Sequence, residues 1–311
     1  MYRYWLYGML VATDIEFPQL VKDKIGDIGV RIREPQIAVA ADEIPAEIRE
    51  RTDVKYEFDR EYSWLSNRTC WIIAEKGSRI KYQLKEGGRM DYLRNYLLGW
   101  GMSMLALQRG ILAMHCSAVA DERGAVLICG ESGAGKSTLT MSLLERGFRL
   151  MADDMAFVEC TGGDCAMVSP AFPYQKLCRD AALERGYRLE ELYYVDEDKD
   201  KFLVPYRGKF ELNAVPVSGV LMLGLVSGEK ILSGEITGVD RFRLVANNLF
   251  LRHLLGQQKY EPWIGQMCLG MAAAVPAAYL GRPLRGETTG QMAAKAMELI
   301  ERWSDKQIVF P

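Results

Sequence analysis

Residues 125–138 read Ala-Val-Leu-Ile-Cys-Gly-Glu-Ser-Gly-Ala-Gly-Lys-Ser-Thr. The five apolar residues at the start of this stretch predict a buried strand over 125–129. Gly130 to Ser137 matches the pattern G-x-x-x-x-G-K-S without a gap. A helix is expected from Lys136 to Arg146, with Gly147 as its stop. A strand that passes through such a loop into a helix is typical of a phosphate-binding loop in an α/β fold.

The residue types in this loop suit an anion. Glycines let the backbone curl so that several amide groups face one phosphate, and the N-terminus of the helix adds positive potential. Lys136 is expected to neutralise the outer phosphates, and the Ser137 hydroxyl to bind Mg²⁺. The sequence therefore predicts ATP and Mg²⁺ as ligands, with these nucleotide-binding residues: Gly130, Glu131, Ser132, Gly133, Ala134, Gly135, Lys136, Ser137 and Thr138.

Two adjacent acids follow the next predicted strand, 148–152. Asp153 and Asp154 come one helix and one strand after the loop, so we expect them at the strand end beside it. One carboxylate can hold Mg²⁺ and the other can accept a proton from an incoming hydroxyl. The residues alone leave open which aspartate has which role.

His115 is one of only two histidines and lies in an apolar stretch, 111–120, that predicts a strand. If this strand neighbours the loop strand, the imidazole can approach Asp154 or a phosphate. The alternative is a histidine that is partly buried in the core.

The combination of these motifs resembles the C-terminal kinase domain of the HPr kinase/phosphorylase family. The resemblance rests on His-Cys-Ser-Ala-Val from His115, on residues 124–137, and on Glu-Arg-Gly-Phe-Arg-Leu-Met-Ala-Asp-Asp over 145–154. It implies a serine kinase whose sheet is related to that of phosphoenolpyruvate carboxykinase. It also implies that Lys136 contacts the reacting phosphates, that Asp154 is the catalytic base with His115 close by, and that Asp153 joins Ser137 at the metal.

The chain departs from this family in two places. The family signature Glu-x-Arg-Gly-Leu-Gly has its nearest counterpart in Pro-Tyr-Arg-Gly-Lys-Phe over 205–210, which lacks the glutamate. Glu211 is a candidate substitute as metal ligand, and the reverse phosphorylase activity is in doubt. The first ninety residues also differ from the family's usual N-terminal domain. Together these features resemble kinase-like proteins of ribosomal peptide pathways, including lasso-peptide tailoring kinases, which phosphorylate a serine of a precursor peptide.

The remaining sequence predicts two domains, a small strand-rich α+β domain over 1–90 and the α/β kinase domain over 91–311. In the first we expect a strand near 28–32 and a hairpin over 71–84. Helices are predicted over 91–108, 242–257 and 289–305, and a strand over 217–225. Four cations are candidate clamps on the transferred phosphoryl group or its acceptor: Arg207, Lys209, Arg241 and Arg243.

Composition narrows the possible partners. Of 311 residues 49% are apolar and 26% are charged, which is ordinary for a globular protein. The net charge of −2 gives no global field for nucleic acid, and the apolar run 96–107 is too short to span a membrane. Seven cysteines without a CxxC pair favour reduced thiols and a cytoplasmic location.

These observations favour a kinase that acts on a serine of a peptide or protein, with a homo-oligomer left open. Two alternatives remain, a small-molecule kinase that uses the same site and a nucleotide-sensing module without transfer activity. A GTPase is disfavoured because the sequence has no N-K-x-D motif.

Overall fold

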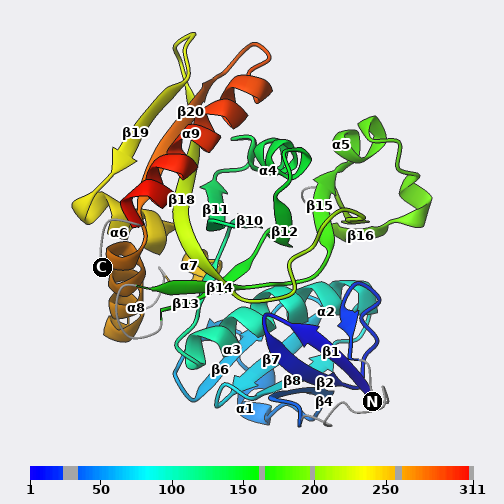
Figure 1. The fold of residues 1–311 in the computed structure, drawn as a ribbon. Coiled ribbons are helices and arrows are strands. Elements are labelled where there is room, and N and C mark those ends of the chain that lie inside the picture. Colours follow the sequence, from blue (N-terminus) through cyan, green and yellow to red (C-terminus); the bar gives the residue numbers. More distant parts are fainter. Residues whose placement is uncertain (24–33, 161–164, 197–199, 256–260, 308–311) are drawn as a thin grey trace, which may run out of the picture. The chain divides into compact units, whose positions relative to one another are not determined.

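A computed structural model describes residues 1–23, 34–160, 165–196, 200–255 and 261–307 (Figure 1). The chain divides into two compact units. The first unit contains Met1–Ile111, Phe172–Tyr206 and His253–Lys259, and the second contains Leu112–Ala171, Arg207–Arg252 and Tyr260–Pro311. The strand predicted near 28–32 lies outside the described residues.

The first unit is built on an eight-stranded sheet with the order β3-β1-β2-β4-β8-β7-β6-β5. The predicted hairpin is confirmed, because β7 and β8 pair antiparallel around a turn in which Lys76 and Gly77 both have positive φ. The elements of this part are β1 (Tyr2–Leu6), β2 (Met9–Thr13), β3 (Val21–Lys22), β4 (Ile37–Ala41), α1 (Ala46–Arg49), β5 (Tyr56–Glu57), β6 (Tyr62–Ser66), β7 (Cys70–Glu75) and β8 (Arg79–Leu84).

The helix predicted over 91–108 is confirmed as three consecutive segments, α2 (Met90–Tyr96), the π-helical η1 (Leu97–Gly101) and α3 (Met102–Gln108). It packs on the first sheet, where a Cβ at Gly101 would lie 3.5 Å from Ile72 and Ile80. This helix therefore belongs to the first compact unit, whereas the domain boundary expected after residue 90 stays a prediction. A three-stranded sheet completes the unit: β15 (Tyr174–Cys178), α5 (Arg179–Glu184), η2 (Leu189–Glu191), β16 (Tyr193–Asp196) and β17 (Lys201–Pro205).

The second unit contains a nine-stranded mixed sheet, so the α/β class is confirmed here. Its main order is β12-β10-β11-β18-β14-β13-β9, and β20 pairs with both β18 and β19. In the parallel strands β11, β18 and β20, Gly130 lies level with Leu223, and Leu223 with Leu280. The strands are β9 (Leu112–Met114), β10 (Ser117–Asp121), β11 (Gly124–Gly130), β12 (Arg149–Ala152), β13 (Ala156–Cys160), β14 (Ala166–Ser169), β18 (Val215–Val226), β19 (Leu232–Ile236) and β20 (Ala277–Pro283).

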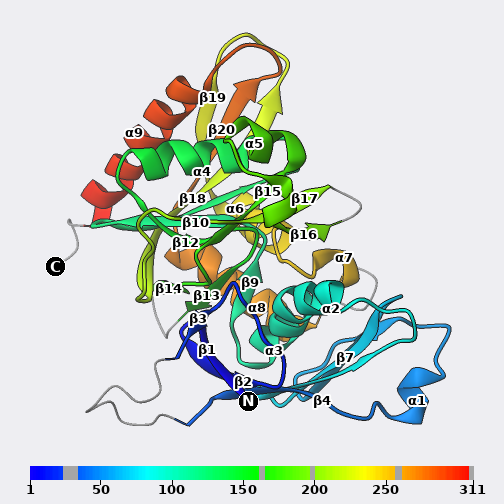
Figure 2. The same cartoon turned by 90° about the vertical axis from the view of Figure 1, so that its right-hand side faces the viewer.

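Helices α4 (Lys136–Glu145) and α9 (Thr289–Gln307) lie side by side against this sheet (Figure 2). Both match the predicted helices closely. Trp303 of α9 packs over Gly219 of β18, where a Cβ would meet the indole at 2.1 Å. Helices α6 (Gly238–Asn247) and α8 (Pro262–Ala274) pack on each other, and α7 (Arg252–Leu255) is a single short turn.

Two predicted elements are wrong because backbone pairing divides them. The strand predicted over 111–120 is two strands, β9 and β10, separated at His115 and Cys116. The helix predicted over 242–257 ends at Asn247, and residues 256–257 lie outside the described part. The segment that follows α6 pairs with β9 instead, since Phe250 N donates to Ala113 O at 2.8 Å and His115 N donates to Asn248 O at 2.6 Å.

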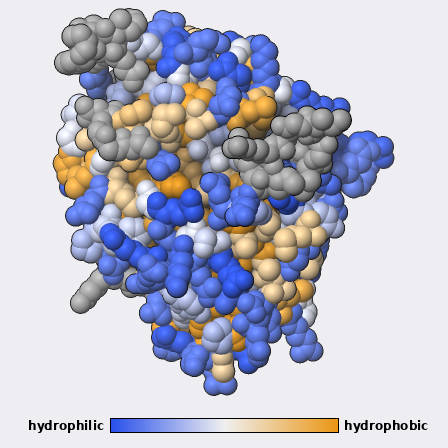
Figure 3. All heavy atoms as spheres, turned by 60° about the horizontal axis from the view of Figure 1, so that its bottom comes forward, coloured by the Kyte–Doolittle hydropathy of each residue, from blue (hydrophilic) through white to orange (hydrophobic). Residues whose placement is uncertain are grey.

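In the described part of the chain, no helix combines the length and apolar character that crossing a membrane requires. The face of the molecule in Figure 3 shows hydrophilic and apolar residues intermixed. The apolar surface in this view is divided into separate areas.

Candidate functional site

The predicted phosphate-binding residues form a short loop between β11 and α4, which we call the 130–137 loop. Gly130, Gly133 and Gly135 have φ values of 149°, 83° and 102°, which residues with a Cβ rarely adopt. A Cβ at Gly130 would lie 2.9 Å from Leu223 O, whereas at Gly133 nothing lies within 4 Å. Gly130 thus lets the loop leave the sheet, and Gly133 leaves the outer side of the loop open.

Lys136 begins α4 and its ammonium group turns back over the loop. Lys136 Nζ donates to Gly130 O at 2.5 Å and to Glu131 O at 3.2 Å. The first amide groups of α4 have no acceptor within the helix. A positive side chain and the N-terminus of a helix therefore meet at one exposed loop, which is a suitable arrangement for an anion.

Asp153 follows β12, which pairs antiparallel with β10. The pairing shifts by one residue between Ala118 and Val119, so an extra residue, Met151, precedes the two acids. Such bulges redirect the side chains that follow them. Asp153 lies beside the first residue of β10, and Ser117 Oγ donates to Asp153 Oδ1 at 2.7 Å.

Asp154 has a left-handed backbone with φ of 73° and a side chain that is 17% exposed. His115 Nδ1 lies 3.0 Å from Asp154 O and 3.8 Å from Asp154 Oδ1. The His115 ring also lies 6.1 Å from the ring of Phe250. The structure thus brings His115 and Asp154 together, and it holds Asp154 in a conformation that is costly for most residues but tolerated by Asp.

Lys136 and Asp153 are close to the same buried thiol, Cys116. A hydrogen bond with Cys129 and full burial raise the pKa of Cys116 well above its usual range. The charge of Lys136 lowers this pKa and the charge of Asp153 raises it, which requires both to lie near Cys116. The strands agree with this, because Asp153 is beside Ser117, and Ser117 pairs with Ile128 two residues before the loop.

The residues present fit a nucleotide-bound Mg²⁺. Ser137 supplies a hydroxyl and Asp153 a carboxylate, which are the hard oxygen ligands that Mg²⁺ prefers. Among the residues that the structure describes, no group of three His, Cys, Asp or Glu could hold a metal ion. A cation at this place would therefore need phosphate oxygens to complete its coordination.

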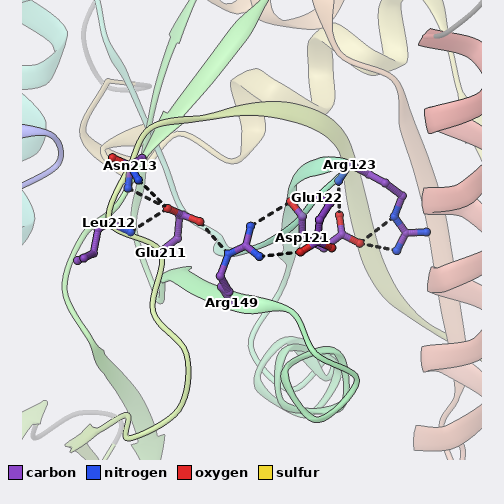
Figure 4. A network of polar contacts seen from close by, with 7 residues as sticks. All are labelled: Asp121, Glu122, Arg123, Arg149, Glu211, Leu212 and Asn213. Carbon is purple, nitrogen blue, oxygen red and sulfur yellow. Dashed lines mark hydrogen bonds and ion pairs between the residues drawn. The ribbon is translucent and has the colours of Figure 1, made fainter.

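Glu211, the candidate substitute for the missing glutamate, is part of a polar network on β12 (Figure 4). Its Oε2 accepts from Arg149 Nε at 2.7 Å, and its Oε1 accepts from the amides of Leu212 and Asn213 at 3.0 Å. Burial raises the pKa of Glu211, but these hydrogen bonds outweigh it and the net pKa is lowered. Both oxygens hold the 209–213 segment in place, so the geometry favours a structural role over a metal ligand.

The four candidate clamps are not brought together. Arg207 and Lys209 are exposed on the segment beside β12, where Lys209 O accepts from Leu150 N at 2.9 Å. Arg241 donates to Ile236 O and Val275 O, next to the start of β20, the end away from the loop. Arg243 pairs with Asp240 at 2.9 Å. Their contact with a phosphoryl group or its acceptor stays a prediction.

Sequence reasoning missed two residues at this site. Ser117 contacts Asp153, and Arg282 Nη2 of β20 donates to Gly133 O at 2.9 Å. Ser117 is a polar residue in an apolar strand, which was a usable signal. Arg282 had only its place at the carboxyl end of a parallel strand, where ligands bind in α/β sheets.

No protein-family model matches the chain. Two curated proteins named HPr kinase/phosphorylase, from two strains of Treponema pallidum, one of them the strain Nichols, are 42% identical to it over 53 residues. The chain is similar to HPr kinase/phosphorylases over this stretch. The stretch covers 17% of the chain and 17% of each relative, well under two thirds of their length. A solved structure, the Hpr(Ser) kinase/phosphatase from Coxiella burnetii, is 13% identical, with a TM-score of 0.32 over 63% of this chain and 97% of that one.

Proposed function

We propose that the chain is a Mg²⁺- and ATP-dependent kinase of the HPr kinase type that phosphorylates a serine hydroxyl of a peptide or protein. The observation that carries this proposal is the 130–137 loop, with Lys136 at the start of α4 and Asp153 close by at the end of β12. The local similarity to HPr kinase/phosphorylases supports the same reaction class.

The residues divide the work of phosphoryl transfer between them. The loop amides and Lys136 hold the phosphates of ATP in place for in-line attack. Asp154 accepts the proton as the serine oxygen forms its bond to the γ-phosphorus and the bond to ADP breaks, and His115 orients Asp154. Mg²⁺, when bound by Ser137 and Asp153, would offset phosphate charge.

The proposed acceptor is a serine of a precursor peptide, as in lasso-type peptide tailoring. This rests on the departures from the family at 205–210 and in the first ninety residues. The exposed Arg207 and Lys209 are the proposed contacts to the acceptor, and the forward reaction is favoured because the family's glutamate is missing. An ATP-dependent reaction of this kind suits the cytoplasmic location that the sequence predicts.

The proposal is tested with Asp154→Asn, because Asn tolerates a left-handed backbone as well as Asp does. Transfer from labelled ATP should fall by about 10²- to 10⁴-fold, while ATP affinity by calorimetry stays near that of the wild type. Lys136→Ala should instead weaken ATP binding itself. Equal transfer by the Asp154 variant would contradict its role as base.

The acceptor class is tested in the same assay. Peptides and proteins with serine, free amino acids and sugars are offered in parallel. Labelled amino acids or sugars alone would indicate a small-molecule kinase. ATP binding without a phosphorylated product from any acceptor would refute the kinase proposal and indicate a nucleotide-sensing module.

A further inference from the structure

Ser117 is a buried hydroxyl whose hydrogen bond goes to a charged partner. Its residue is 2% exposed, and it sits at the start of β10 between Ile128 of β11 and the end of β12. A buried hydroxyl needs a hydrogen-bond partner, and an ionised carboxylate can only accept. The 2.7 Å contact is therefore a donation from Ser117 Oγ to Asp153 Oδ1, of the charge-assisted kind that is stronger than a neutral bond.

This bond restricts the orientation of one carboxylate without using all of its acceptor capacity. A carboxylate offers about four lone-pair positions on its two oxygens. Ser117 occupies one position on Oδ1, which fixes the plane of the group while other positions still suit a cation.

Asp154 has a different neighbour that comes from the same short segment. His115 lies next to Asp154, and Ser117, two residues further on, lies next to Asp153. The left-handed backbone at Asp154 turns the chain between the two acids. Residues 115–117 thus give each aspartate its own partner, an imidazole for one and a hydroxyl for the other.

We propose that Ser117 is a positioning residue that holds the Asp153 carboxylate ready for the Mg²⁺ of bound nucleotide, and so assigns the metal-side role to Asp153. This inference rests on the proposed function, because it takes Mg²⁺–ATP as the ligand. Residues that hydrogen-bond to a metal ligand keep that ligand in its binding orientation, and their loss lowers metal affinity.

The chain offers a matched control in Ser218. It is 1% exposed, lies in the same sheet on β18, and donates through Oγ to a backbone carbonyl, Ala125 O, at 3.0 Å. Ser117→Ala and Ser218→Ala each remove one buried hydroxyl, but only the first removes a contact to an acid of the site. A purely structural role for Ser117 predicts the same behaviour for both variants.

The experiment measures ATP binding by calorimetry across a range of free Mg²⁺ and again in EDTA, with thermal unfolding recorded for every variant. Ser117→Ala should raise the Mg²⁺ concentration for half-maximal effect by about 10-fold and leave ATP affinity in EDTA unchanged. Ser218→Ala should leave the Mg²⁺ dependence at the wild-type value. Ser117→Thr, which keeps a hydroxyl, should restore most of the response, and it stands in for Ser117→Ala if that variant does not fold.

Three results would overturn the inference. They are an equal Mg²⁺ response in the two alanine variants, a loss of affinity that persists in EDTA, and an unchanged Mg²⁺ dependence in Asp153→Asn. None of these readouts requires phosphoryl transfer. A wild-type chain that binds Mg²⁺–ATP but yields no product would refute the proposed kinase and leave the role of Ser117 supported by its own variants.

Discussion

Gly130 gives the sharpest test of the loop geometry, because two separate costs meet there. Its φ of 149° is unfavourable for a residue with a Cβ, at about 1–2 kcal/mol. An alanine Cβ would also lie 2.9 Å from Leu223 O and 3.1 Å from Leu223 Cβ, on a paired and buried strand that cannot move away easily. Overpacking of this kind adds about 1–3 kcal/mol. Gly130→Ala should therefore destabilise the second unit by about 2–5 kcal/mol.

Gly147 provides the matched control at the other end of α4. Its φ is 101° and a Cβ would meet nothing within 4 Å, so Gly147→Ala should cost only the backbone term of about 1–2 kcal/mol. Thermal unfolding and ATP affinity are measured for both variants. Gly130→Ala should unfold at the lower temperature and lose ATP affinity, whereas Gly147→Ala should keep its affinity. The reasoning is refuted if Gly147→Ala is as destabilised as Gly130→Ala, or if Gly130→Ala binds ATP normally.

Three further outcomes are expected. The folded-state pKa of Glu211 is lowered, so its stabilising contribution is present above its ordinary pKa and lost as the pH falls through the folded value; the unfolding temperature of Glu211→Gln should therefore vary less with pH below about 4.3 than that of the wild type. Arg282→Met removes the bond to the loop carbonyl and should weaken ATP binding, whereas Arg285→Met, three residues along, serves as the control and should not. Alkylation of the native protein should modify the exposed Cys165 and Cys178 first, since the other thiols are at least partly buried; rapid labelling of all seven cysteines would contradict the packing around the loop strand.

The strand, loop and helix around residues 124–147 could be predicted almost to the residue. The reason is that local signals agree there: an apolar run, glycines at positions with positive φ, and Gly147 with φ of 101° after the helix. The long C-terminal helix was equally predictable from its apolar stripe. Its five predicted core residues are all buried: Met292, Ala296, Leu299, Ile300 and Trp303.

The failures lie where pairing with a distant segment overrides a local pattern. Residues 111–120 are apolar enough for one strand, but β9 pairs with β13 while β10 pairs with β11 and β12. The chain must break between them, and His115 lies at that break. Residues 248–250 have a helical pattern and nevertheless pair with β9, which no local propensity could indicate.

The same distinction separates the predicted site residues from the missed ones. The loop and the two aspartates are adjacent in sequence to the elements that position them, so a motif could identify them. Ser117 reaches Asp153, and Arg282 reaches Gly133, only because the sheet order puts β10 between β11 and β12 and places β20 beside β18. The break at His115 has a part in this as well, since it lets one residue of the segment contact Asp154 and another, two positions later, contact Asp153. A continuous strand over 111–120 would leave residues 115 and 117 in regular pairing, so the break that sequence reasoning missed is the feature that gives the two acids different neighbours.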